Sequence, residues 1–359
     1  MAVFREVPVK RGLVWLAVGT WTALAVGCPK QDAGTKAAPQ TAAASSGGAP
    51  KPAGPKVGLV FDVGGRGDKS FNDAADRGLT KAAAELGAVN QVVEPGAGAD
   101  RETALRQLAA KKMDLVIGVG FLFTEDINRL ALDFPQQKFA CVDYTVTPGK
   151  TVPPNVLALK FKEEEGSFLV GALAALISTS PKLGFVGGMD IPLIHRFRAG
   201  YTAGVKHVRP DAEVLTVFAG VTGEAFTNPG KGKELALSLY GKGVDIIFHA
   251  AGSTGLGVFE AGRAQKKLAI GVDSDQYAEA PGVVLTSMVK RVDVAVFDAI
   301  AAVKNGTFQG GVRDLDLKAG AVDYVYDANN KALIPDAVRT RVEALRAEII
   351  ANKIVVPNQ

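Results

Sequence analysis

From residue 57 onward, short apolar runs rich in β-branched residues alternate with amphipathic stretches, and a turn separates each run from the next stretch. The runs predicted as strands are residues 57–62, 90–98, 114–120, 138–144, 156–161, 182–189, 212–220, 245–252, 268–276 and 283–289. The stretches predicted as helices are residues 73–86, 101–112, 125–133, 163–177, 194–207, 230–240 and 256–265. This alternation predicts an α/β fold with mostly parallel sheets and right-handed crossovers.

The strand–helix pattern restarts at residues 156–161, after a proline-containing stretch at residues 146–155. Two successive sets of strands and helices favour two domains over one large sheet. We place the boundary near Ala158, which makes residues 57–157 a first lobe and residues 158–289 a second.

The C-terminal part has a different pattern. Residues 322–334 predict a hairpin with Asn329 and Asn330 in its turn. Pro335 then opens an amphipathic helix. Residues 354–357 are apolar and are predicted to pack as an edge element.

The N-terminus carries a positively charged region followed by an apolar stretch, residues 12–27, that ends at Cys28. The stretch is short for a membrane span, which needs roughly 20 residues, and it suits a signal peptide. Small residues just before the cysteine resemble a bacterial lipobox, in which the cysteine is lipidated. The sequence therefore predicts a lipoprotein signal peptide at residues 1–27; the alternative is an ordinary signal anchor with a chance cysteine.

Residues 28–56 are predicted to be the lipidated cysteine and a flexible tether, because the segment consists mostly of Ala, Pro, Gly, Ser, Thr, Lys and Gln. Such a segment has almost nothing to bury and cannot offset its ordering entropy. The predicted location is the cell membrane, with the folded part lipid-anchored on the periplasmic or extracellular face.

Composition excludes several other classes. After Cys28 only Cys141 remains, so the folded part can form no internal disulfide and no cysteine zinc site. The net charge of +4 includes the basic leader and tether, so it gives no argument for binding nucleic acid. No metal or other cofactor is predicted, and the chain is expected to be a monomer.

Functional residues are expected where strands end and helices begin, because open α/β sheets bind ligands at that edge. Asp62, Asp143 and Asp273 each end a predicted strand. An aspartate there commonly caps the next helix, and this explanation fits Asp62 as well as a functional one. Asp143 and Asp273 are not directly followed by a helix, so we favour a role in binding vicinal hydroxyl groups.

Aromatic residues and one lysine complete the set of candidates. Phe71 follows a polar loop and could form a flat wall for a planar ligand or fold back on the core as a hydrophobic staple. Phe226 is similarly placed, whereas Phe248 ends a strand and fits the core better. Lys290 lies between a strand and a helix; it is either solvated or reaches ligand hydroxyls in a cleft of carboxylates.

Several catalytic and nucleotide-binding motifs are absent or incomplete. The loop GGRGDKS has Asp68 where a phosphate-binding loop has glycine, and its carboxylate would oppose a bound phosphate. AAGSTGLG lacks the spacing of a dinucleotide loop. The three histidines, His195, His207 and His249, show no metal-ligand spacing, and no GxSxG elbow is present.

The ordered motifs DVGGRGDKSFN, EEGSFLVGALAA, GFVGGMDIPLI, HAAGSTGLGV, IGVDSDQ and LTSMVKRVD resemble the basic membrane protein family of ABC importer substrate-binding lipoproteins. The resemblance covers essentially the whole folded region. It implies a type I periplasmic-binding fold of two Rossmann-like lobes joined by crossover strands. Residues 156–161, residues 283–289 and a segment near Leu315 would be the crossovers. Segments at roughly 290–320 and the C-terminal elements would then return to the first lobe.

The same resemblance implies a ligand and residue roles, since several members capture purine nucleosides. By position, Phe71 would stack on the base, Asp143 would contact it, and Asp273 and Lys290 would take the ribose hydroxyls. The remaining candidates for the binding wall are Asp62, Ser70, Asn72, Phe226, Phe248, Gly252 and Gly255. The implied partners are a purine nucleoside and an ABC permease, and no reaction is catalysed.

Three other functions remain open for comparison. Carboxylates with aromatics suit a sugar or a signalling compound equally well. A nucleoside hydrolase is a second alternative, although no residue pattern points to one. A cytoplasmic sugar-responsive regulator of the same fold would need a DNA-binding segment ahead of the lobes, which the tether cannot supply.

Overall fold

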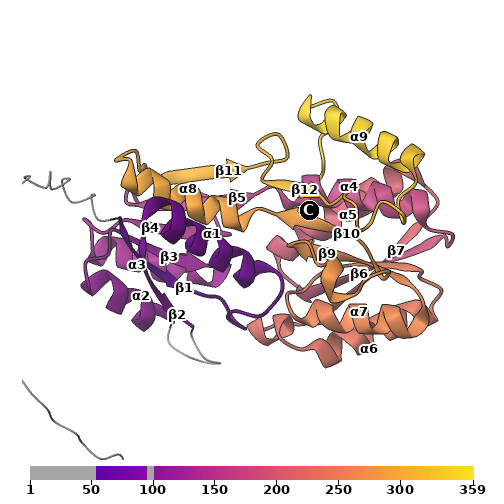
Figure 1. Ribbon diagram of the computed structural model, residues 1–359, viewed down its shortest axis with the longest axis horizontal. Helices are drawn as coiled ribbons and strands as arrows, with labels where there is room; N and C mark the ends of the chain where they lie inside the picture. Colours follow the sequence, from indigo (N-terminus) through magenta and orange to yellow (C-terminus); the bar gives the residue numbers. More distant parts are fainter. Residues whose placement is uncertain (1–53, 95–100) are drawn as a thin grey trace, which may run out of the picture. The chain divides into compact units, whose positions relative to one another are not determined.

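Residues 54–94 and 101–359 are described by the computed structural model, and they contain two six-stranded sheets (Figure 1). The predicted signal peptide, Cys28 and the tether up to residue 53 lie outside the described residues. None of the described helices is both long and apolar enough to cross a membrane.

The first sheet, as far as the chain is described, has six parallel strands in the order β11-β5-β4-β3-β1-β2. They are β1 (Lys56–Val60), β2 (Val89–Val93), β3 (Leu115–Val119), β4 (Phe139–Val142), β5 (Val156–Phe161) and β11 (Gly311–Leu315). The flanking helices are α1 (Phe71–Leu86), α2 (Arg101–Ala110), α3 (Thr124–Asp133) and α8 (Val292–Lys304). In β3, Leu115 and Ile117 face the core beneath α1 and α8, while Val116 faces the core beneath α2 and α3. Burial on both faces explains why these strands are continuous apolar runs.

The second sheet has six described strands in the order β12-β10-β9-β8-β6-β7. They are β6 (Lys182–Met189), β7 (Glu213–Gly220), β8 (Ile246–Ala250), β9 (Leu268–Asp273), β10 (Val284–Lys290) and β12 (Val322–Tyr324). Helices α4 (Glu163–Ile177) and α5 (Pro192–Val208) cover one face, and α6 (Pro229–Gly241) and α7 (Thr254–Gln265) cover the other. All pairs are parallel except β10 with β12. The predicted α/β class with two mostly parallel sheets is confirmed.

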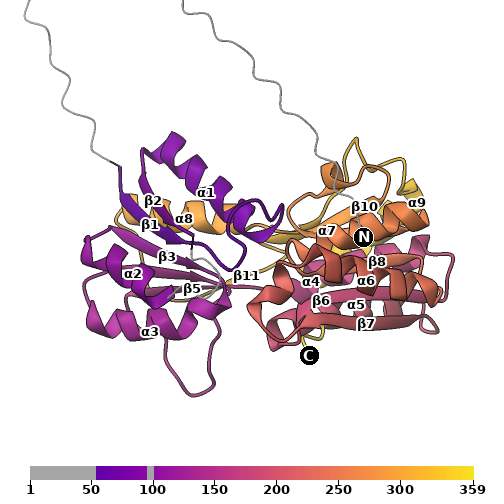
Figure 2. The ribbon, with the colours of Figure 1, turned by 90° about the horizontal axis from the view of Figure 1, so that it is seen from below.

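Within the described residues the chain passes between the sheets three times. It leaves the first sheet after β5, returns after β10 into α8, and leaves again between β11 and β12. Figure 2 shows α8 beside α1 in one half and α9 (Asp336–Ile350) in the other. That these passages act as hinges stays a prediction.

The C-terminal part differs from the expectation in three respects. Residues 322–334 form no hairpin: β12 pairs with β10, and a turn follows in which Asn330 donates through Nδ2 to the carbonyl oxygens of Leu285 and Val325. One long-range bond from this buried amide, to Leu285, and one local bond, to Val325, replace the expected hairpin pairing. β12 and α9 lie with the second sheet, whereas the C-terminal elements were expected with the first. Residues 354–357 form no strand.

Glycines allow α4 and α5 to pack in close contact. A side chain at Gly204 would collide with the backbone carbonyl of Phe168, and one at Gly171 would collide with the backbone of Tyr201. This contact explains why α4 is apolar on most sides, because α5, β10, β12 and α9 surround it.

We expect Gly204→Ala to lower the free energy of unfolding by about 1–3 kcal/mol, as overpacking of a tight contact does. Gly241→Ala is the control, since Gly241 is also a helical residue, the last one of α6, but has no atom within 4 Å of the added methyl group. Alanine is a better helix former than glycine by up to about 1 kcal/mol. The free energy of unfolding of Gly241→Ala should therefore be unchanged or increased. Urea denaturation of both variants measures the difference, and equal stability would contradict the packing argument.

Candidate ligand-binding site

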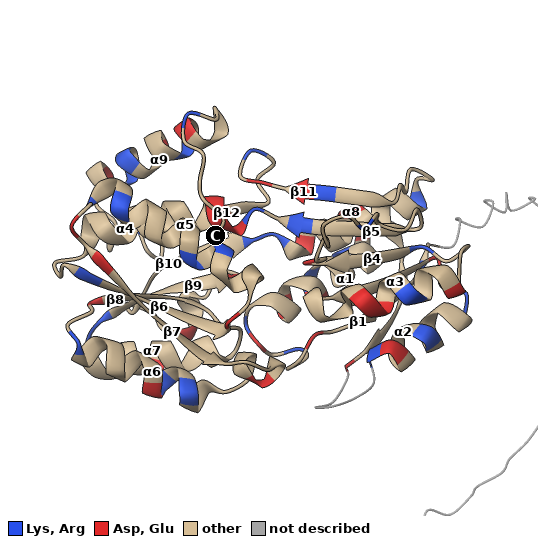
Figure 3. Cartoon of the chain, turned by 180° about the vertical axis from the view of Figure 1, so that it is seen from behind, with Lys and Arg blue, Asp and Glu red and all other residues tan. Residues whose placement is uncertain are grey.

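A cavity of about 60 Å³ lies where the carboxyl ends of strands from both sheets meet. Its charged lining consists of Asp62 and Asp68 between β1 and α1, Asp143 after β4, Asp273 at the end of β9 and Lys290 at the end of β10. Few charged residues lie on the central strands of the sheets (Figure 3). The charged side chains that line the cavity are therefore concentrated at the strand ends. The cavity occupies the edge at which open α/β sheets bind ligands.

The loop between β1 and α1 is organised by the carboxylate of Asp68. Asp68 accepts hydrogen bonds from the backbone N–H groups of Ser70, Asn72 and Asp73, at 2.9, 2.8 and 3.1 Å. The side chain of Asn72 bonds to Asp68 and accepts from the backbone N–H of Asp62. The N-terminus of α1, which would attract an anion, is therefore already bound to an internal carboxylate.

The same loop also touches the second sheet. Ser70 donates through Oγ to Asp273 Oδ2 at 2.6 Å, and Ser274 donates to the carbonyl oxygen of Ser70 at 2.8 Å. Gln276 donates through Nε2 to the carbonyl oxygen of Lys69 at 3.1 Å. We call these contacts the Ser70 clasp. Through it, the two sheets are held together directly beside the cavity.

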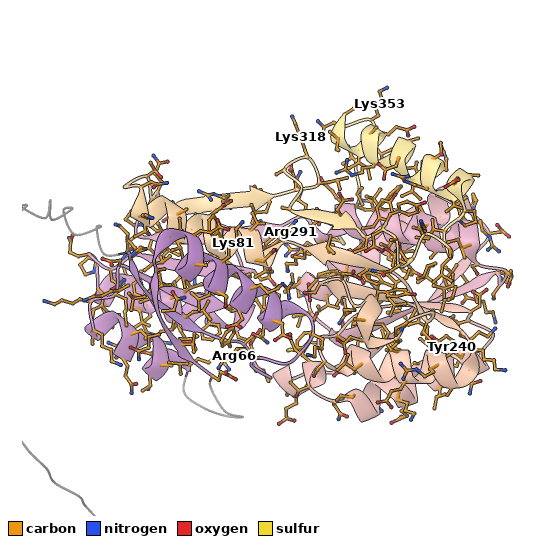
Figure 4. All side chains as sticks on the ribbon, in the orientation of Figure 1. Arg66, Lys81, Tyr240, Arg291, Lys318 and Lys353 are labelled. Atoms are coloured by element: carbon orange, nitrogen blue, oxygen red, sulfur yellow. The ribbon has the colours of Figure 1, made fainter. Side chains whose placement is uncertain are left out.

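The ammonium group of Lys290 is the charge most deeply buried in the site. Its side chain is 1% exposed and lies 2.6 and 2.7 Å from the two carboxylate oxygens of Asp143. Glu163, the first residue of α4, lies 3.0 Å away through Oε1, and its Oε2 lies 2.9 Å from Nε of Arg196 on α5. Arg291, labelled in Figure 4, directly precedes α8 and pairs with Asp293 in the first turn of that helix.

Aromatic rings form the walls around this charge. The Nζ atom of Lys290 lies 5.2 Å from the ring centre of Phe71, 4.9 Å from that of Phe161 and 5.6 Å from that of Phe197. Phe226 contributes a further wall from the second sheet's side. Cation–π contacts of this kind stabilise a desolvated ammonium by about 2 kcal/mol.

Asp143 and Asp273 have left-handed backbone conformations, with φ of 59° and 63°. Such angles are uncommon outside glycine, although aspartate tolerates them better than most residues. Backbone conformations of this kind concentrate at functional sites. Here each one turns the chain sharply at a strand end, so that the carboxyl group lies against the cavity.

Burial shifts the protonation of these carboxyl groups. It raises the pKa of Asp62 and of Asp273 to about 7 each, and it raises the pKa of Asp68. Burial also raises the pKa of Asp143, against the opposing effect of the Lys290 ammonium. For Lys290 burial acts downward, but the neighbouring carboxylates outweigh it and leave its pKa above the ordinary value.

The cavity is lined by most, but not all, of the residues chosen from the sequence. Asp62, Phe71, Asn72, Asp143, Phe226, Gly252, Asp273 and Lys290 line it. Ser70 lies beside it in the clasp. Phe248 is fully buried in the core against Tyr201 and Phe185, and Gly255 packs against the ring of His249. Ligand contact by each candidate stays a prediction.

Sequence reasoning missed Glu163, Arg196 and Phe197. A glutamate that opens a helix is favourable to the helix dipole, and this ordinary role hid the contact of Glu163 with Lys290. Arg196 and Phe197 lie inside an amphipathic helix, where nothing in the local pattern sets them apart. The one available signal was the run of three glutamates, residues 163–165, at the predicted lobe boundary.

The histidines and metal-binding groups give no sign of another centre. His249 is buried, bonds through Nε2 to Gln276 at 3.1 Å and has a pKa lowered by burial to about 4, so it is neutral. It does not line the cavity. In the described ranges, no group of histidine, cysteine, aspartate or glutamate could hold a metal ion.

Comparison with known proteins gives one consistent family. Residues 56–359 match the family described as "ABC transporter substrate-binding protein PnrA-like". An uncharacterized lipoprotein of Pyrococcus horikoshii is 39% identical over 284 residues, covering 75% of this chain and 68% of that one. Basic membrane protein A of Borreliella afzelii is 32% identical, covering 84% and 91%. A solute-binding protein of an ABC transporter system from Aeropyrum pernix has a similar structure, with a TM-score of 0.77, 32% identity, and coverage of 85% and 94%.

The raised pKa of Asp273 makes a prediction about stability. Between about pH 4 and pH 7 the folded protein holds a proton that the unfolded chain releases, because the two pKa values are about 7 and 3.8. The stabilisation that this proton gives the folded state is fully present below about pH 4. It falls as the pH rises and is lost once the pH has passed 7. Asp273→Asn removes that dependence.

Urea unfolding at pH 4, 5, 6 and 7 tests this. We expect the free energy of unfolding of Asp273→Asn, relative to the unsubstituted protein, to increase steadily over that range. Asp275→Asn, at an exposed neighbour, controls for the loss of one carboxylate. A difference that does not change with pH would contradict the buried, protonated state of Asp273.

Proposed function

The chain belongs to the PnrA-like family of ABC transporter substrate-binding proteins, and from that premise we propose that it captures a purine nucleoside and delivers it to a membrane permease. The observation that carries the proposal is the meeting of aromatic rings with carboxyl groups and one ammonium group in a single cavity. A nucleoside combines a flat base with vicinal hydroxyl groups, and these two parts need those two kinds of surface.

In this proposal Phe71 and Phe226 stack on the base and Asp143 accepts hydrogen bonds from its N–H groups. Asp273 and Lys290 bind the ribose hydroxyls. Asn72 and Gly252 complete the wall, and Asp62 lies at its edge. Phe248 and Gly255 would support the cavity from outside it, since neither lines it.

The charges of the site support selection of an unphosphorylated ligand. Four carboxyl groups, those of Asp62, Asp68, Asp143 and Asp273, line the cavity beside one ammonium group. The N-terminus of α1 is bound by Asp68, so the anion position that phosphate-binding folds use is filled. A phosphate would meet carboxylates without a free helix terminus to receive it.

Capture would consist of closure of the two lobes around the ligand, with the three passages between the sheets as the hinge. The closed form would then dock on the permease. Lipidation at Cys28, together with the tether, would hold this monomer at the membrane. The protein would catalyse no reaction in this cycle.

Isothermal titration calorimetry of the protein with adenosine, guanosine, inosine, uridine, ribose and common sugars tests the ligand class. We expect binding of purine nucleosides. At pH 8, above the pKa of about 7 of Asp273, we expect a loss of about tenfold or more in affinity in Asp273→Asn, because a hydrogen bond to a charged group contributes about 1.5–3 kcal/mol. Asp275→Asn should bind as the unsubstituted protein does. Tight binding of a sugar with no binding of nucleosides would overturn the proposal in favour of the sugar receptor.

Prolonged incubation with inosine separates a receptor from a hydrolase. The proposal expects that only inosine is recovered by chromatography. Release of free hypoxanthine in proportion to protein concentration would show catalysis instead.

The charge argument predicts discrimination against nucleotides. At pH 8, above the pKa of about 7 of Asp62 and of Asp273, adenosine 5′-monophosphate should bind at least about tenfold more weakly than adenosine, because like charges at close range in a partly buried site repel by more than 1 kcal/mol. Competition calorimetry measures both affinities in one buffer. Equal affinities would mean that the phosphate points away from the carboxylates and that Asp68 has no part in selection.

A further inference from the structure

We propose that Glu163 is a positioning residue that holds the ammonium group of Lys290 in place for ligand hydroxyl groups. The inference rests on the proposed nucleoside function, in which Lys290 binds the ribose. Glu163 does not itself line the cavity, so it would act only through Lys290.

Each carboxylate oxygen of Glu163 lies at ion-pair distance from a different cation, and neither accepts a hydrogen bond. The residue is fully buried at the start of α4, directly after the chain leaves β5. One oxygen lies 3.0 Å from Nζ of Lys290 and the other lies 2.9 Å from Nε of Arg196. Because Arg196 holds the second oxygen, the first is constrained to one direction.

Lys290 has few other polar neighbours. Asp143 lies on one side of its ammonium, and the rings of Phe71, Phe161 and Phe197 surround the rest. An ammonium has three donor hydrogens. Asp143 accepts one of them, and Glu163 attracts the ammonium as an ion pair without accepting a hydrogen bond, so donor hydrogens remain for a ligand.

Removing the charge of Glu163 would change this balance. Asp143 can bind the ammonium through both of its oxygens, at 2.6 and 2.7 Å. Without a second carboxylate opposite, the ammonium would be drawn fully toward Asp143. The donor that faces the cavity would turn away from the ligand hydroxyl groups.

The charges of the cluster are balanced as a group. Lys290 and Arg196 carry two positive charges, and Asp143 and Glu163 carry two negative ones. Breaking a buried pair by removing one partner costs more than the pair contributes, because the remaining charge is left uncompensated. Glu163 therefore also keeps Lys290 charged and buried when a ligand engages Asp143.

Calorimetry with three ligands tests the inference: adenosine, 2′,3′-dideoxyadenosine and adenine. In Glu163→Gln we expect the ratio of adenosine to dideoxyadenosine affinity to fall about tenfold or more, as for loss of a charge-assisted hydrogen bond. The affinity for adenine should change much less. A purely structural role would lower all three affinities or the stability together and leave the ratio unchanged.

Glu164→Gln is the matched control. Glu164 is the next residue on α4 and is also buried, yet the described residues place no cation within ion-pair distance of it. In Glu164→Gln, the ratio of adenosine to dideoxyadenosine affinity should equal that of the unsubstituted protein. Glu163→Asp, which keeps a carboxylate, should recover part of the ratio.

Arg196→Gln provides a second route if Glu163→Gln does not fold. The Arg196 side chain is 22% exposed, so the change is less disruptive, and it releases the orientation of Glu163. We expect Arg196→Gln to lower the ratio of adenosine to dideoxyadenosine affinity as well, but by less than Glu163→Gln does. An unchanged ratio in both variants overturns the inference, whereas failure of the unsubstituted protein to bind any nucleoside overturns the proposed function instead.

Discussion

The burial of one ammonium group, that of Lys290, is the constraint on which the site depends. A lysine that is 1% exposed requires compensating charge. Asp143 supplies it from the first sheet, and Glu163 supplies it from the start of α4. Because Lys290 ends β10, a strand of the second sheet, this ion cluster spans both halves of the molecule.

The proposed closure and the proposed ligand binding would use some of the same groups. The carboxyl group of Asp273, proposed to bind ribose, already accepts a hydrogen bond from Ser70 of the opposite half. The loop that carries Ser70 is held by Asp68 and ends in Phe71, the proposed stacking ring. A ligand that contacts Phe71 and Asp273 together would therefore bridge the same two elements as the clasp. Ligand binding would then favour the closed state by its differential affinity for it.

The local pattern of apolar and polar residues was sufficient to predict most helices and strands of the fold. A parallel strand buried on both faces is an apolar run, and the helix after it has a periodic apolar stripe, so both kinds of element are visible in the chain. The hairpin expected at residues 322–334 is wrong for a physical reason. Asn330 bonds to Leu285 and Val325 rather than closing a two-residue turn, and these partners depend on the neighbouring strand β10.

The positions of Asp62, Asp143 and Asp273 were determined by the sequence alone, because a strand's end is defined by where its apolar run stops. Which aromatic faces the cavity was decided by tertiary packing: Phe226 lines it and Phe248 is buried in the core. The ion cluster was also decided there, since Lys290 and Asp143 are 147 residues apart in the chain. Charges attract through space and not along the sequence, so only the folded chain shows that Glu163 and Arg196 belong to the site.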